Sequence, residues 1–235
     1  MAIELEARRP TGYAATMPLV DIAWRPQSSV ALDHAVEQAL SEGERRIETF
    51  FGGSSKAIRK DFVASDHRLV FEALRAIRRD HLATGNVFCE WGSGFGVIAC
   101  LAALLGFDAY GVERAPEFVR SARALAADLD LPVLYAEADY HPIGFDSYFD
   151  AVGESRQLLR SPPRDADTGW ERQLGITMED VSILFIYPWP AEAQLVEELF
   201  EASAQEGSLL ISYNEDADAR IQRFVLEPSD SLGDD

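Results

Sequence analysis

The strongest constraint on the fold of this 235-residue chain is a regular alternation, between residues 86 and 213, of short apolar runs with longer segments of helical periodicity. Five runs have the length and residue types of strands, and they cover 86–90, 108–113, 131–136, 181–187 and 208–213. Helical patterns cover 95–105, 116–129 and 191–204. Because strands that alternate with helices build parallel sheets, the sequence predicts an α/β fold with a doubly wound, mostly parallel sheet.

The flanking segments predict a helical extension and poorly ordered ends. A helix is expected over 31–51, and another after Ser65, which we expect to be its N-cap. Residues 220–226 are a weaker sixth strand, and residues 1–29 are expected to form an irregular arm. The predicted units are an N-terminal arm and helix (1–60), a main domain (61–226) and a disordered acidic tail (227–235).

The segment at about 140–180 has no regular pattern. A loop of that length inside a compact domain is usually a lid, an insertion or a missed element. Residues 149–152 read as a possible short strand. We expect an insertion that contains some helix.

Composition limits the classes of partner. The chain has 40 acidic and 21 basic residues, a net charge of −19, and its basic residues do not cluster, so no nucleic-acid partner is expected. No apolar run approaches the roughly 20 residues of a membrane span, and the first residues lack a secretory signal, so we expect a cytoplasmic protein. Cys89 and Cys100 are expected to be buried free thiols, and no metal site is expected.

A glycine-rich loop, Glu90-Trp91-Gly92-Ser93-Gly94-Phe95-Gly96, follows the first of the five runs and opens a helix. Glycine there allows positive φ and close approach of a ligand to the backbone, while the helix start favours an anion. The dinucleotide spacing G-x-G-x-x-G requires a glycine at position 97, where this chain has Val97. The loop therefore departs from the dinucleotide pattern by one residue.

The spacing acid-x-G-x-G-x-G resembles the first motif of Rossmann-like (class I) S-adenosylmethionine-dependent methyltransferases, and the resemblance extends over about residues 61–213. It implies a Rossmann-like methyltransferase fold and S-adenosylmethionine as cofactor. The glycine loop would pack against the methionine and ribose part, which assigns cofactor contacts to Gly92, Ser93, Gly94 and Gly96. The resemblance also implies that Glu90 helps to hold the cationic methionine end, and negative charge suits such a ligand.

Two further acids follow predicted strands. Glu113 ends the second strand, where a carboxylate can accept hydrogen bonds from both ribose hydroxyls. That position also fits a dinucleotide, so Glu113 indicates a ribose but does not distinguish S-adenosylmethionine from a dinucleotide. Asp139 falls where the family places an acid that contacts the adenine amino group, with Tyr140 beside it. An alternative interpretation is that each acid is an ordinary solvated residue of a loop.

The acceptor is expected beside the end of the fourth strand, at Tyr187-Pro188-Trp189-Pro190. Many methyltransferases that act on amide or base nitrogens carry Asn or Asp where this chain has Tyr187, which argues against those acceptors. Tyr187, Trp189 and Tyr140 are the candidate acceptor-pocket residues, since aromatic faces attract an amine by cation–π interaction. An equally acceptable interpretation is that Tyr187 and Trp189 only pack the strand end.

Two segments look like the corresponding parts of protein-lysine methyltransferases with a Rossmann-like rather than a SET core. They are residues 61–65 (DFVAS) and residues 181–207. The implied acceptor is an amine, of a cationic protein segment or a small molecule, and an acidic protein would attract either. Two alternatives stay open. One is a methyltransferase-like module that binds cofactor or a partner without turnover, and the other is an NAD-dependent oxidoreductase.

Overall fold

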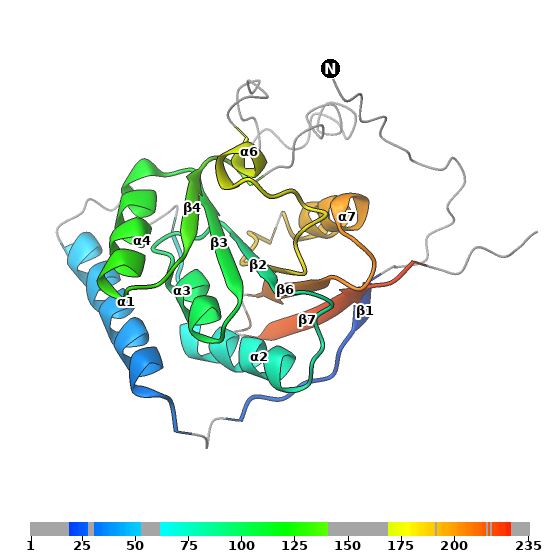
Figure 1. Cartoon of the computed structure of the whole chain (residues 1–235), viewed down its shortest axis with the longest axis horizontal. Helices are drawn as coiled ribbons and strands as arrows, with labels where there is room; N and C mark the ends of the chain where they lie inside the picture. Colours follow the sequence, from blue (N-terminus) through cyan, green and yellow to red (C-terminus); the bar gives the residue numbers. More distant parts are fainter. Residues whose placement is uncertain are drawn as a thin grey trace, which may run out of the picture.

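The computed structural model describes residues 19–27, 31–52, 62–140, 169–190, 192–214, 216 and 218–226 (Figure 1). The start of the expected arm, most of the expected insertion with the possible strand at 149–152, and the acidic tail lie outside the described residues. Within the described part no helix has the length and apolar character needed to cross a membrane.

A seven-stranded sheet forms the centre of the protein, in the order β1-β7-β6-β5-β2-β3-β4. The strands are β1 Leu19–Asp21, β2 Val87–Trp91, β3 Asp108–Glu113, β4 Leu134–Glu137, β5 Ile183–Ile186, β6 Leu209–Tyr213 and β7 Ala219–Phe224. The five strands from β6 to β4 are mutually parallel, whereas β7 pairs antiparallel with both β6 and β1. The predicted α/β fold with a mostly parallel sheet is confirmed.

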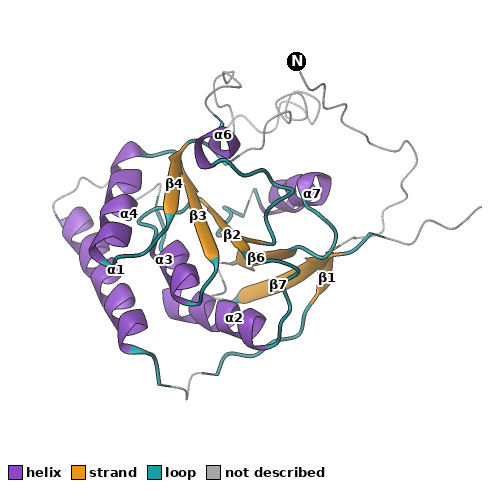
Figure 2. Ribbon diagram, viewed as in Figure 1, coloured by secondary structure: helices purple, strands orange, loops and turns teal. Residues whose placement is uncertain are grey.

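Helices cover both faces of the sheet, as Figure 2 shows. They are α1 His34–Gly52, α2 His67–Arg79, α3 Val97–Leu104, α4 Pro116–Asp128, α6 Trp170–Leu174 and α7 Ala193–Ser203. One apolar core joins α1, α2, α3 and α4 to one face of the sheet, and a second joins α6 and α7 to the other. Successive residues of β2 alternate between these cores, with Phe88 in the first and Cys89 in the second. Cys89 and Cys100 are buried and free, as expected.

The expected irregular arm contains a strand. Residues Leu19–Asp21 pair with β7, and the register places Leu19 opposite Phe224. Asp21 also forms an ion pair with Arg220. The indole N–H of Trp24 then donates to the carbonyl of Ala219. A run of three residues is too short to show a period of two, so its pairing partner, rather than its own sequence pattern, makes it a strand.

The N-cap of α2 is Asp66 and not Ser65. The Asp66 side chain accepts a hydrogen bond from the Leu69 N–H at 3.0 Å, which is the usual reach of a cap to the third helical residue. Ser and Asp are both good caps, and neighbouring candidates cannot be ranked by residue type alone. The division of the chain at residue 60 stays a prediction, although α1 belongs to the same core as α2.

The carboxyl ends of the five parallel strands meet at one edge of the sheet. Near this edge a continuous row of paired residues crosses the five strands, in the order Ser212, Ile186, Trp91, Val112 and Ala136. After β2 the chain continues to β3 and β4 on one side, and it returns to β5 and β6 on the other. Ligands of open α/β sheets bind beyond the carboxyl edge at such a reversal, which here lies between β2 and β5.

Candidate functional site

The glycine loop leaves β2 at this reversal, and its three glycines all have positive φ. The surroundings of Gly92 and Gly96 differ. A Cβ on Gly96 would lie 2.4 Å from Tyr135 Oη and 2.8 Å from the Cβ of Ala122, so Gly96 is required for packing inside the protein. A Cβ on Gly92, where φ is 72°, would meet no atom within 4 Å. The backbone at Gly92 therefore faces open space into which a ligand can approach closely.

The N–H groups of the loop are largely taken by the protein itself. Those of Gly92 and Ser93 both donate to the carbonyl of Val112, each at 2.9 Å. The N–H of Gly96 donates to the carbonyl of Ser93, and the N–H of Gly94 donates to Glu113 Oε2 at 2.9 Å. These donors are not available to a phosphate group in this conformation.

Glu90 lies beneath the loop and caps helix α3. Its side chain is only 4% exposed, and Oε2 accepts a hydrogen bond from the Ala99 N–H at 3.0 Å. The N-cap residue Gly96 has no side chain to do this, so a carboxylate from the neighbouring strand satisfies the helix start instead. Burial raises the pKa of Glu90 well above its usual value, and the nearby charge of Glu113 adds to this increase. The predicted role of Glu90 in holding a cationic ligand stays a prediction.

Glu113 ends β3 as expected, and its carboxylate accepts hydrogen bonds from two backbone segments. Oε2 accepts from the Gly94 N–H, and Oε1 accepts from the Ala115 N–H at 2.8 Å, just before α4. Each oxygen of a carboxylate can accept more than one hydrogen bond, so this arrangement leaves acceptor capacity for ribose hydroxyls. That role of Glu113 also stays a prediction.

Two buried polar atoms beside Gly92 have no hydrogen-bond partner among the described residues. They are Nε1 of Trp91, whose side chain is 1% exposed, and Oγ of Ser93, whose side chain is 4% exposed. Buried polar atoms are nearly always paired, so the residues on both sides of Gly92 carry hydrogen-bonding capacity that the described part of the protein does not use. The residues present fit a nucleoside cofactor at this edge of the sheet.

The residues after β4 reach back toward the glycine loop. Glu137 pairs in register with Glu113, and Asp139 follows it, half-buried. Tyr140 stacks on Trp91, with ring centroids 5.1 Å apart and planes 19° apart. The Trp170 indole N–H donates to the Tyr140 carbonyl at 2.9 Å and ties α6 to this turn. The structure therefore brings Asp139 and Tyr140 to the same edge as the loop.

Three residues that follow β5 differ in their surroundings. The half-buried Tyr187 packs edge-to-face against Tyr213, with ring centroids 4.8 Å apart. Trp189 is 46% exposed. Glu192 places Oε2 3.5 Å from the Tyr140 hydroxyl. The sequence pattern did not indicate this residue. Its only sequence signal is its position six residues beyond β5, because a single glutamate at a helix start is common.

No group of three or more His, Cys, Asp or Glu side chains in the described ranges is placed to hold a metal ion. The chemistry of this edge is that of carboxylates and aromatic rings. The site therefore suits a ligand that offers hydrogen-bond donors or positive charge.

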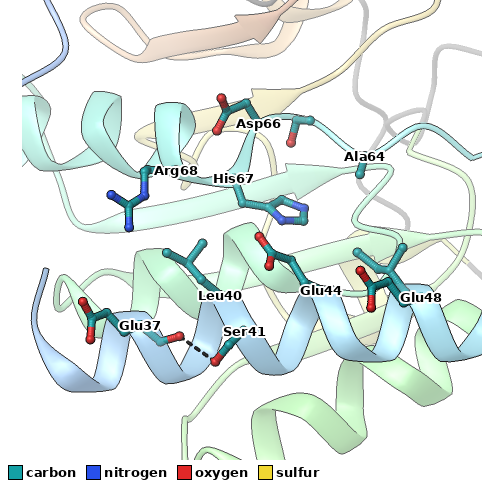
Figure 3. Close-up of a pocket in the computed structure, with 11 residues that line it drawn as sticks. Glu37, Leu40, Ser41, Glu44, Glu48, Ala64, Asp66, His67 and Arg68 are labelled. Carbon is teal, nitrogen blue, oxygen red and sulfur yellow. Dashed lines mark hydrogen bonds between the residues drawn. The ribbon is translucent and has the colours of Figure 1, made fainter. Parts of the chain in front are cut away.

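A second concave region lies between α1 and the start of α2 and has a volume of about 590 Å³ (Figure 3). Its walls come from these two helices and the residues just before α2, and no residue of the glycine loop lines it. His67 extends from α2 toward Glu44 of α1. Burial lowers the pKa of His67 to about 4, although the charge of Asp66 acts in the opposite direction.

His67 should contribute to acid sensitivity. Its folded pKa of about 4 lies below the ordinary value of 6.5, so between these values the unfolded chain binds a proton that the folded chain does not. The free energy of unfolding is expected to fall by about 1–2 kcal/mol from this residue as the pH drops from about 7.5 to 5, after allowance for partial exposure. Urea unfolding of His67→Gln at the two pH values should show a smaller decrease than the native chain. The exposed His34, replaced by Gln, is the control, and equal decreases in all three proteins would contradict the assignment.

No protein-family model matches the chain, and no curated protein matches it. Solved structures with a similar course of the chain include an RNA methyltransferase from Salinibacter ruber in complex with S-adenosyl-L-homocysteine, at 17% identity and a TM-score of 0.45 over 73% of this chain and all of the other. A putative O-methyltransferase from Klebsiella pneumoniae has 13% identity and a TM-score of 0.44 over 79% and 67% of the two chains. A hypothetical protein from Thermus thermophilus has 17% identity and a TM-score of 0.42 over 74% and 88%. These similarities are too distant to indicate an activity.

Proposed function

We propose that this protein is an S-adenosylmethionine-dependent methyltransferase. The observation that carries the proposal is the glycine loop, which is open at Gly92 while carboxylates take two of the nearby N–H groups. A pyrophosphate at this position would need those N–H donors and would meet the negative charge of Glu113. A nucleoside that carries a cationic amino-acid end avoids both difficulties. The loop therefore favours the sulfonium cofactor over NAD.

The proposed roles of the residues follow from their places at the edge. Gly92 and Ser93 would pack against the methionine and ribose part, Glu113 would accept the ribose hydroxyls, and Asp139 would accept the adenine amino group. Glu90, Gly94 and Gly96 would act by holding the loop, since their contacts are with the protein. The bound cofactor supplies a methyl group that is already activated by a sulfonium.

The residues of the chain then have to align an acceptor and exclude water, because methyl transfer to an activated carbon needs no metal and no covalent intermediate on the protein. Tyr140, stacked on Trp91, forms a rigid aromatic wall next to Gly92. We propose an amine acceptor, either of a lysine in a protein or of a small molecule. The net charge of −19 supports a cationic partner and disfavours RNA or DNA.

Ligand binding distinguishes the two cofactors. We expect S-adenosylhomocysteine to bind in calorimetry and to stabilise the protein against heat, since a ligand at 100 times its dissociation constant adds about 2.7 kcal/mol. NAD is expected to do neither. Stabilisation by NAD alone would favour an oxidoreductase, and the absence of binding by S-adenosylhomocysteine would refute the proposal.

One observation favours a second candidate, a module that binds the cofactor without turnover. Tyr187, which replaces the polar residue of many methyltransferases, packs against Tyr213. Incubation with radiolabelled S-adenosylmethionine and amine acceptors separates the candidates, because only the enzyme transfers label.

A further inference from the structure

Glu192 is a half-buried carboxylate with unused acceptor capacity. Its side-chain contact in the described part of the chain is the Tyr140 hydroxyl at 3.5 Å, which is long for a hydrogen bond between oxygens. No Arg or Lys in the described ranges forms an ion pair with it, whereas Glu42 on α1 pairs with Arg45 and Arg46. A partly buried carboxylate gains from a cationic partner, and the residues that the structure describes supply none at ion-pair distance from Glu192.

The position of Glu192 is fixed relative to the glycine loop. Its N–H donates to the Trp189 carbonyl at 2.7 Å, and its carbonyl accepts from the Val196 N–H in α7. Its carboxylate then meets Tyr140, which stacks on Trp91, the residue before Gly92. A continuous series of contacts therefore leads from Glu192 to the open face of the loop.

Two aromatic residues are linked to Glu192, one through its carboxylate and one through its backbone. Tyr140 presents its ring on Trp91 and its hydroxyl to Glu192, and the exposed indole of Trp189 belongs to the same turn as Glu192. A carboxylate next to aromatic rings attracts ammonium groups by charge and by cation–π interaction. Neutral hydroxyl or amide acceptors gain much less from such a place.

We infer that Glu192, together with the hydroxyl of Tyr140, forms the acceptor subsite and selects a primary aliphatic ammonium group. The inference rests on the proposed function. The ammonium docks on the Glu192 carboxylate and releases one proton to water before transfer. The nitrogen lone pair then forms the N–C bond, the C–S bond breaks, and its electron pair stays on sulfur, so that a sulfonium becomes a neutral thioether and the amine becomes a methylammonium. In this scheme Glu192 binds the acceptor directly and orients its nitrogen.

The test measures how an N-acetylated hexalysine peptide and 1,5-diaminopentane bind to the protein saturated with S-adenosylhomocysteine. We expect the native chain to bind at least one of these cationic probes and Glu192→Gln to bind it about 10- to 100-fold more weakly. Tyr140→Phe keeps the ring on Trp91 but loses the hydroxyl, and should show a smaller loss. The hexalysine peptide with every lysine acetylated is expected not to bind.

Glu206→Gln is the matched control, because Glu206 is exposed, lies before β6 at the opposite edge of the sheet, and loses the same charge. It should bind the probes like the native chain. The inference is overturned if Glu192→Gln binds as well as the native chain, or if the native complex binds neither probe. Binding of S-adenosylhomocysteine itself should be unchanged in Glu192→Gln, so failure of the subsite and failure of the proposed function give different results.

Discussion

Replacing Gly92 with alanine is expected to weaken the binding of S-adenosylhomocysteine by about 10- to 100-fold in a protein that still folds. The new methyl group would point into the open space where the loop faces the proposed ligand, because no protein atom lies within 4 Å of that position. The methyl group therefore has room in the free protein and meets the ligand only in the complex. Calorimetric titration measures the change in affinity directly.

Gly175 provides an unusually close control. It ends α6 with the same φ of 72°, and a Cβ there would also meet nothing within 4 Å. Gly92→Ala and Gly175→Ala should both lose about 1 kcal/mol of stability from the left-handed backbone. Only Gly92→Ala should lose affinity. If both variants bind S-adenosylhomocysteine equally well, the open face at Gly92 is not the cofactor site.

The largest effect on stability is expected for Gly96→Ala. Its φ of 75° is nearly that of Gly92, so the backbone strain of the two alanine variants is comparable. The added methyl group, however, would overlap the Tyr135 ring and the Cβ of Ala122, both buried in the core. We expect a loss of about 3 kcal/mol or more in the free energy of unfolding, measured by urea denaturation.

Gly92→Ala is the matched comparison for that loss, and the difference between the two variants isolates the overlap. Tyr135→Phe tests the same contact from the other side, since the Tyr135 hydroxyl donates to the Gly96 carbonyl at 2.9 Å. In the double variant, Gly96→Ala should cost less, because the nearest clashing atom is absent. A cost for Gly96→Ala no larger than that for Gly92→Ala would contradict the packing described here.

The sequence predicted the elements whose pattern is local and repeated. The apolar runs and helical periods located β2 to β6, and the weaker sixth strand was confirmed as β7. The glycine loop was placed correctly after β2, and Glu113 at the end of β3. These features depend on periodicity and on the position of residues relative to strand ends, which a single sequence displays.

Features that depend on distant partners could not be predicted in this way. The cap that Glu90 provides to α3 joins residues nine positions apart through a strand and a loop, and nothing in residue type distinguishes it from a ligand contact. The contact between Tyr140 and Glu192 spans 52 residues of the chain. The orientation of the Tyr187 side chain depends on its contact with Tyr213 in the neighbouring strand. In the last two cases the partner is set by the arrangement of the strands, which local pattern does not encode.

The pairing of β1 with β7 has a consequence for how the chain is made. Leu19 lies opposite Phe224, so the partner of β1 leaves the ribosome 205 residues later, after about 10–40 s at ordinary rates of synthesis. Until then β1 has no strand to join, and the central parallel strands can be complete before the edge is. The edge of the sheet therefore closes last, and the nascent protein carries β1 unpaired through most of translation.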